Sequence, residues 1–274
     1  MTASTWIVQH TRIAPRTRSR KRTGNHKRLD SSAIGRGVSV LAVCVLGVAA
    51  LLALNWIYQV VRKPAEMLAP VGTALTKSPR ATWQTYGPLF QANSTAIMTP
   101  ELLAALAQVE GQGNPLARTY WRWRLSLNPF DLYRPASSAV GMFQITDATF
   151  AEARSYCIRA HEVVRDGPWY DVHSCWFNGL YSRLRPADAI EMTAANLHRR
   201  VTGLLGAPRA ARASLAQQQD LAALIHLCGP ARGERFVRRG FRVAPGERCG
   251  DQSVRDYLDR VNLMKRQFVR LQAG

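Results

Sequence analysis

Glu110 is the residue of this chain whose type and position most clearly suggest chemistry. It follows Leu103, Leu106 and Val109 in a stretch with apolar residues at helical spacing. Leu106 and Glu110 are four residues apart, so both lie on the helix face that should pack against the core. Burial disfavours the charged form of a carboxyl group, and a carboxyl group that keeps its proton can act as a general acid. A glutamate near a helix end can also simply turn to solvent, so the pattern leaves both interpretations open.

The elements around Glu110 read as helices. Thr99-Pro100-Glu101 predicts a helix start, with threonine as N-cap, proline in the first turn and an acid at the positive end of the helix dipole. Gly111 is predicted to end that helix directly after Glu110. Strand signals are few and no repeat is visible. Further helices are predicted at about 147–157, 187–205, 214–228 and 252–271.

The composition divides the 274-residue chain into four parts. Residues 1–36 contain nine Arg or Lys and one acid, which predicts a basic tail that cannot form a core. Residues 37–61 contain no charge and are long enough for a membrane helix, which needs about 20 apolar residues. Residues 62–80 hold three prolines and a glycine and are expected to be a linker. Residues 81–274 are expected to form one mainly α-helical domain.

The charges flanking the apolar stretch predict its orientation. The heavier basic load precedes it, so the positive-inside rule places residues 1–36 in the cytoplasm and the domain on the other side of the membrane. A cleaved signal peptide is the alternative. Its apolar core runs about 7–15 residues before a small-residue cleavage site. Here the run is longer, and Asn55-Trp56-Ile57-Tyr58 offers no clean site, which favours an uncleaved anchor.

The formal charge of +19 raises the question of nucleic-acid binding. The predicted topology argues against it for the main domain, although the N-terminal tail could contact DNA or anionic lipid. A basic outer domain suits an acidic polymer, and a cell-wall glycan with carboxylates is one.

Five cysteines bear on the compartment. Cys44 lies inside the apolar stretch and reads as a small apolar residue. The other four, Cys157, Cys175, Cys228 and Cys249, suggest two disulfides in an oxidising compartment. Three pairings are possible, and we favour the local pairs 157–175 and 228–249. A zinc site is the alternative, since two histidines lie between Cys157 and Cys175, but their spacing matches no common ligand motif.

Four sequence blocks resemble, in order, the soluble lytic transglycosylase (SLT) family of the lysozyme-like superfamily. That family has a catalytic glutamate at a helix end, then a serine-containing loop and a Gly-Leu-Met-Gln segment, an Asn-Leu helix, an Ala-Tyr-Asn-Ala-Gly-Pro stretch and a closing Tyr-Val-x-x-Val. The similar residues here are Glu110 with Ser138-Ala139-Val140-Gly141-Met142-Phe143-Gln144-Ile145-Thr146, Asn196-Leu197, residues 222–230, and Tyr257-Leu258-Asp259-Arg260-Val261. The resemblance spans about residues 96–268 and implies a lysozyme-like domain after a single membrane helix.

The resemblance also implies site residues and a reaction. Glu110 would be the one catalytic acid and base, cutting peptidoglycan between N-acetylmuramic acid and N-acetylglucosamine with closure of a 1,6-anhydro ring; no cofactor or metal is expected. The residues expected to bind substrate are Gln144, Gly141, Ser138, Met142, Phe143, His226 and Tyr257. The anchor would then lie in the bacterial inner membrane with the domain in the periplasm. The basic tail would permit docking to an envelope-spanning secretion or conjugation complex, which the sequence itself does not indicate.

The chain departs from the family pattern at three places. Gly111 stands where the family usually has serine, and His226-Leu227 replaces a Tyr-Asn pair, so a tyrosine that helps to position substrate is missing. Residues 118–134 lengthen the interval before Gln144. Their aromatic and basic side chains suit either stacking on sugars or packing on the domain. Two other functions stay open: a muramidase of the goose-lysozyme type, and a non-catalytic scaffold that binds peptidoglycan.

Overall fold

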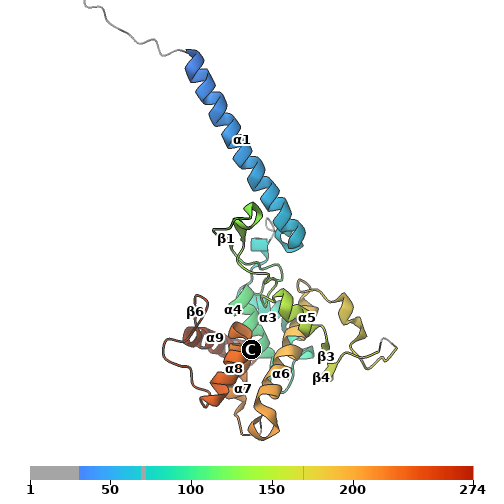
Figure 1. Ribbon diagram of the computed structural model, residues 1–274. Helices are drawn as coiled ribbons and strands as arrows, with labels where there is room; N and C mark the ends of the chain where they lie inside the picture. Colours follow the sequence, from blue (N-terminus) through green and yellow to red (C-terminus); the bar gives the residue numbers. More distant parts are fainter. Residues whose placement is uncertain (1–30, 69–71, 169, 211, 274) are drawn as a thin grey trace, which may run out of the picture. The chain divides into compact units, whose positions relative to one another are not determined.

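The computed structural model describes residues 31–68, 72–168, 170–210 and 212–273 (Figure 1). Most of the predicted basic tail, residues 1–30, lies outside the described residues. The chain divides into two compact units, Met1–Ala50 and Leu51–Gly274, which we describe separately.

The first helix, α1 (Ser31–Arg62), begins in the first unit and ends in the second. Its apolar part, Arg36–Arg62, is 27 residues long, and an 18-residue window within it has a mean hydropathy of 2.7. By length and composition this helix could cross a membrane, as the uncharged stretch at residues 37–61 predicted.

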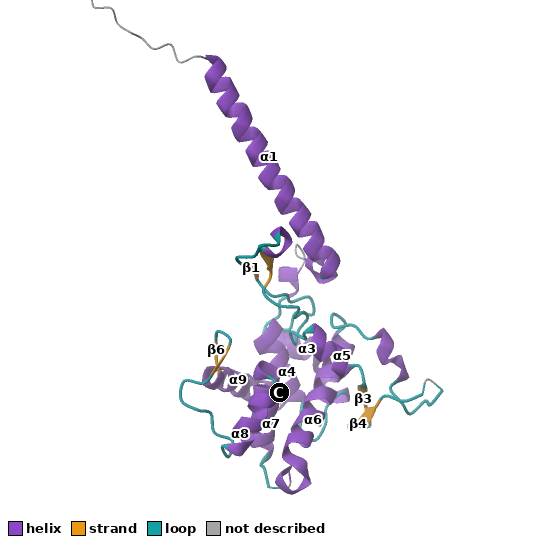
Figure 2. Cartoon of the chain, viewed as in Figure 1, coloured by secondary structure: helices purple, strands orange, loops and turns teal. Residues whose placement is uncertain are grey.

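The second unit is mainly helical, as predicted, with three two-stranded antiparallel sheets between the helices (Figure 2). Its longer helices are α3 (Pro79–Ala92), α4 (Pro100–Gly111), α5 (Asp147–Ala153), α6 (Pro186–Ala210), α7 (Leu215–Cys228), α8 (Pro230–Arg238) and α9 (Val254–Ala273). The short 3-10 helices are η1 (Pro64–Leu68), η2 (Thr73–Leu75), η3 (Pro129–Asp131) and η4 (Trp176–Leu180). The paired strands are β1 (Trp121–Trp123) with β2 (Tyr133–Pro135), β3 (Tyr156–Arg159) with β4 (Glu162–Arg165), and β5 (Arg248–Cys249) with β6 (Gln252–Ser253).

The helix α4 lies at the centre of the core. It packs against α3 and α9, and its side chains from Leu102 to Ala107 are at most 1% exposed. The predicted start at Thr99-Pro100 is confirmed, but the helix includes Gly111 and ends at Gln112, whose φ of 53° is left-handed. Gly111 is therefore part of the last turn rather than the residue that stops it.

Other helix predictions are confirmed with local differences. The helix α7 begins after Ser214, whose side chain forms a capping box with Gln217. The helix predicted at 147–157 is shorter and ends at Ala153. The chain then turns into β3 because the buried side chain of Asn178 donates hydrogen bonds to the carbonyls of Arg154 and Tyr156, at 2.9 and 2.8 Å. The segments without a predicted element of their own include the helices α3 and α8 and the hairpin β1–β2.

The favoured disulfide pairing is confirmed. Cys157 bonds to Cys175, and Cys228 bonds to Cys249. Because the four thiols are joined in disulfides, they do not form the zinc site that the sequence left as an alternative. The second disulfide connects the end of α7 to the segment that leads into α9.

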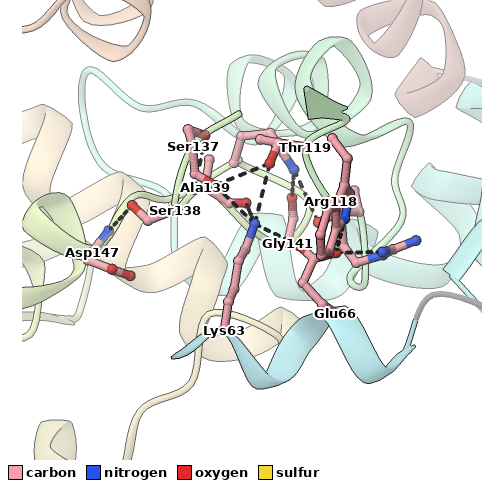
Figure 3. A network of polar contacts seen from close by, with 12 residues as sticks. Lys63, Glu66, Arg118, Thr119, Ser137, Ser138, Ala139, Gly141 and Asp147 are labelled. Atoms are coloured by element: carbon pink, nitrogen blue, oxygen red, sulfur yellow. Dashed lines mark hydrogen bonds and ion pairs between the residues drawn. The ribbon is translucent and has the colours of Figure 1, made fainter. Parts of the chain in front are cut away.

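The segment expected to be a linker makes specific contacts with the domain. Glu66, in η1, is only 1% exposed. Its carboxylate pairs with Lys63 at 3.0 Å and Arg118 at 2.7 Å, and it accepts a hydrogen bond from Trp121 Nε1 at 2.9 Å. Figure 3 shows this network, in which Lys63 also donates to the carbonyls of Ser137 and Ala139. The segment that follows α1 is thereby fixed to the start of the hairpin β1–β2.

Candidate active site

Glu110 occupies the last turn of α4, and its side chain is 14% exposed. The apolar residues one and two turns before it, Leu106 and Leu103, are fully buried. Glu110 is thus at the edge of the core, on the face that the helical spacing predicted. The amino-acid pattern alone could not exclude that its side chain turns to solvent, and the structure leaves it largely enclosed.

Two side chains from later helices approach the Glu110 carboxylate. Tyr257, in the first turns of α9, donates a hydrogen bond from its hydroxyl to Glu110 Oε1 at 2.5 Å. The Nε2 atom of His226, near the end of α7, lies 3.7 Å from the same oxygen, too far for a hydrogen bond. Within the described residues, both polar contacts of the carboxylate involve Oε1, which leaves Oε2 for a substrate atom.

Tyr257 is a buried donor held in its protonated form. Its side chain is 1% exposed, and burial raises the pKa of its hydroxyl well above the usual value, helped by the nearby charge of Glu110 and by the hydrogen bond to it. A tyrosine that keeps its proton remains a hydrogen-bond donor across the physiological range. Tyr257 therefore contacts Glu110 directly, and its substrate-binding role stays a prediction.

Glu110 lines an open cavity of about 430 Å³. The rest of its wall comes from Gly72 and Thr76, from residues 111, 112 and 114, and from the start of the insertion at residues 116–121. Glu110 is the only acid among the described residues that line it. His226 and Gln144 line a second, smaller cavity of about 60 Å³ together with Asn196 and Arg200. The carboxylate thus borders an open cavity, and His226 beside it lines the smaller one.

The predicted substrate loop takes a tight turn. Gly141 has φ +80°, and a Cβ at this position would collide with the backbone carbonyl of Arg183, so glycine is required here. Gln144 turns its amide inward and donates to the carbonyls of Gly141 and Ala117, at 2.9 and 3.2 Å. Gln144 thus fixes the turn and also borders the smaller cavity.

Three other predicted residues lie away from the Glu110 cavity. Met142 and Phe143 are fully buried in the core. Ser138 lines a different cavity, of about 620 Å³, and its hydroxyl accepts a hydrogen bond from the backbone N–H of Asp147. The structure therefore brings Glu110, His226 and Tyr257 together, whereas Ser138, Met142 and Phe143 do not line the Glu110 cavity.

The surroundings of Gly111 account for a glycine where the family usually has serine. A Cβ on Gly111 would lie 2.7 Å from Met142 Cα and 2.8 Å from the Met142 carbonyl oxygen. Real side chains do not approach a backbone so closely. The turn that follows the serine-containing loop therefore packs directly on the last turn of α4, and that turn includes Glu110.

Sequence reasoning missed one buried group near the site, the carboxylate of Glu66. Its partners Arg118 and Trp121 line the Glu110 cavity. The only signal was the spacing of Lys63 and Glu66, three residues apart in a segment that looked like a linker.

Comparison with protein-family models identifies the domain that contains Glu110. A scan against protein-family models matches residues 88–218 to the family described as "Transglycosylase SLT domain". Glu110, Ser138 and the 141–144 segment fall inside the match, whereas His226 and Tyr257 follow its end. No match was found among curated proteins or among solved structures. This family acts on peptidoglycan as a lytic transglycosylase in general terms. Residues 88–218 thus match a transglycosylase SLT domain, a member of the lysozyme-like superfamily.

Proposed function

We propose that this chain is a membrane-anchored peptidoglycan lytic transglycosylase that cleaves the β-1,4 bond between N-acetylmuramic acid and N-acetylglucosamine. The observation that carries the proposal is the Glu110 carboxylate, held through one oxygen by Tyr257 at the edge of an open cavity. The SLT domain supports peptidoglycan as the substrate.

The reaction needs one group that gives and then takes a proton. Glu110 donates its proton to the glycosidic oxygen, and the bond from that oxygen to C1 of the muramic acid breaks. The substrate's own N-acetyl group stabilises the positive charge at C1. The Glu110 carboxylate then removes the proton of the C6 hydroxyl of the same sugar, and O6 bonds to C1. A 1,6-anhydro ring forms, Glu110 regains its proton, and no water is consumed.

The residues around Glu110 suit this double role. The Tyr257 hydrogen bond fixes Oε1, so that Oε2 can face first the glycosidic oxygen and later the C6 hydroxyl. His226 borders the carboxylate at 3.7 Å and is a positioning candidate in place of the family's tyrosine. Gln144 and Gly141 form the adjacent turn, and we keep them as candidates for contact with the sugar.

The surroundings favour this reaction over hydrolysis by a pair of carboxylates. Glycosidases that use water generally place a second acid within about 5–10 Å of the first. Two acids from neighbouring segments of the chain have partners of their own: Glu66 is paired with Lys63 and Arg118, and Asp131 in the insertion is paired with Arg134 at 3.3 Å. Neither lines the cavity of Glu110.

The helix α1 supports a proposal for the cellular location of the protein. We propose a single pass through the bacterial inner membrane, with residues 1–36 in the cytoplasm and the SLT domain in the periplasm. Two disulfides in the domain agree with an oxidising compartment. An envelope-spanning secretion or conjugation complex is the class of partner that we propose for the basic tail, with local opening of the wall as the result.

The test uses the full chain, purified in detergent, with isolated peptidoglycan as the substrate and mass spectrometry of the soluble products. We expect 1,6-anhydro-muropeptides from the wild type and none from Glu110→Gln. The matched control is Glu101→Gln, the same change at the start of the same helix, which should leave the products unaltered. Products with reducing ends would instead indicate a muramidase. Binding to the wall without any cleavage would indicate the scaffold.

A further inference from the structure

The hairpin β1–β2 exposes large apolar side chains at its tip. Its strands pair Trp121 with Pro135 and Trp123 with Tyr133. Beyond them, Leu125 and Leu127 are completely exposed, and Trp123 is 68% exposed. Adjacent exposed apolar residues of this size usually mark a contact surface rather than a water-facing loop.

The same hairpin is attached to the end of α1, within the second unit. Asn55 Nδ2 donates to the carbonyl of Tyr133 at 2.7 Å, and Gln59 Nε2 donates to the carbonyl of Phe130 at 2.6 Å. Asn55 and Gln59 are four residues apart, on one helix face, and both are less than 10% exposed. The ring of Tyr58 lies 4.9 Å from that of Phe130. In Figure 1 the hairpin lies beside this end of the helix.

The length of α1 indicates which part of the membrane this attachment faces. Its apolar part has 27 residues, which rise about 40 Å in an α-helix, whereas the hydrocarbon core of a bilayer is about 30 Å thick. If residues from Arg36 onward enter the core, the helix leaves it after about 20 residues, so that Asn55 lies at the edge of the core and Gln59 in the headgroup region. Trp56 and Tyr58 agree with this level, because these residue types favour membrane interfaces.

The composition of the tip suits a lipid interface better than a glycan. Arg122 and Arg124 alternate with Trp123 and Leu125, so that cationic side chains can reach the headgroups while the apolar ones enter the acyl region. Sugars stack on aromatic faces, but fully exposed leucines offer a sugar no stacking face or polar group. Their burial in lipid would remove their apolar surface from water, which is favourable.

We propose that the hairpin tip, residues 123–132, inserts its apolar side chains into the bilayer interface next to the end of α1. This inference rests on the proposed membrane anchoring. Insertion of the hairpin would also position the active site, because residues 118–121 at the start of the hairpin line the Glu110 cavity, and Arg118 and Trp121 are held by Glu66. The cleft is thereby held at a set height above the membrane, and cleavage is confined to the glycan strands nearest to it.

The test places one fluorescent label at a time on the full-length chain. Cys44→Ser removes the one free cysteine described, and Leu127→Cys then accepts an environment-sensitive dye. The labelled protein is reconstituted in vesicles of phosphatidylethanolamine and phosphatidylglycerol, with or without lipids that have a quencher on the acyl chain. Leu46→Cys, in α1, reports on the anchor. Leu180→Cys, an exposed leucine 75% accessible in η4, is the matched control.

We expect the labels at positions 46 and 127 to be quenched, and the label at position 180 to stay unquenched. Quenching at 46 without quenching at 127 overturns the hairpin proposal and leaves the anchor intact. Absence of quenching at both positions overturns both proposals. Equal quenching at 127 and 180 also overturns the hairpin proposal, since the whole domain then lies on the bilayer. A label at 127 that responds to soluble glycan fragments and not to the quenching lipids indicates a sugar-binding hairpin instead.

Discussion

Gly111 offers the sharpest test of how Glu110 is held, because one added methyl group would meet only backbone. An alanine Cβ there would lie 2.7 Å from Met142 Cα, whereas ordinary contacts begin at 3.4 Å. The end of α4 and the Met142 turn would have to separate by about 0.7 Å, and neither can do so by rotating a side chain.

The cost of that separation can be estimated. Overpacking of this kind typically destabilises a protein by about 1–3 kcal/mol. For a domain of this size each kcal/mol lowers the melting temperature by about 2–4 °C, so Gly111→Ala is expected to lower it by about 2–12 °C. Because Glu110 is the preceding residue, the shift also misplaces the catalytic acid. A displacement near 1 Å can reduce turnover by about 100-fold. Gly111→Ser, which restores the residue usual in the resembling family, is expected to do the same.

The matched control is Gly203→Ala in the regular part of α6. A Cβ at Gly203 would have no atom within 4 Å, and alanine is favoured over glycine inside a helix by about 1 kcal/mol. This variant should melt at the wild-type temperature or higher and keep full activity. The assays are thermal unfolding by circular dichroism and the initial rate of muropeptide release. A Gly111→Ala variant with wild-type melting and wild-type rate would refute the close packing of α4 on the Met142 turn.

Three more predictions concern Tyr257 and the cysteines. Tyr257→Phe keeps the buried ring but loses a hydrogen bond to a carboxylate, worth about 1.5–3 kcal/mol, so the melting temperature should fall by about 3–12 °C. The rate of release, measured at a temperature at which the variant is folded, should fall about 10- to 100-fold because Glu110 Oε1 is no longer held; an unchanged rate would show that the contact with Glu110 has no catalytic effect. Burial first, and then the charge of Glu110, raise the pKa of Tyr257, so the folded chain keeps a proton that the unfolded chain releases above about pH 10. The contribution of this proton to the free energy of unfolding is therefore fully present below that pH and is lost as the pH rises further. Denaturant titrations should show that the free energy of unfolding falls less above about pH 10 for Tyr257→Phe than for the wild type. An equal fall in both proteins would contradict the assignment. Cys228→Ala should cost about 2–4 kcal/mol of unfolding free energy by breaking the bond to Cys249, while Cys44→Ser should cost little; similar melting of the two variants would argue against the disulfide.

The elements that could be predicted from the sequence are those that depend on residues close together in the chain. The start of α4 at Thr99-Pro100 and the start of α7 at Ser214 follow from local capping and helix-dipole preferences, which act within one turn. The apolar stretch before Arg62 depends on composition alone. Helical spacing placed Glu110 on the same face as Leu103 and Leu106, but it left open whether the Glu110 side chain turns to solvent.

The residues that contact Glu110 from distant parts of the chain depend on how the helices pack, which the sequence pattern does not give. Tyr257 is 147 residues away along the chain, and its hydroxyl reaches the carboxylate because α9 packs on α4. In the same way, Glu66 looked like part of a linker, and only its contacts with Arg118 and Trp121 show that it is buried. Local preferences do not specify such pairs, because the free energy of burying a polar group depends on the partner that packing brings to it.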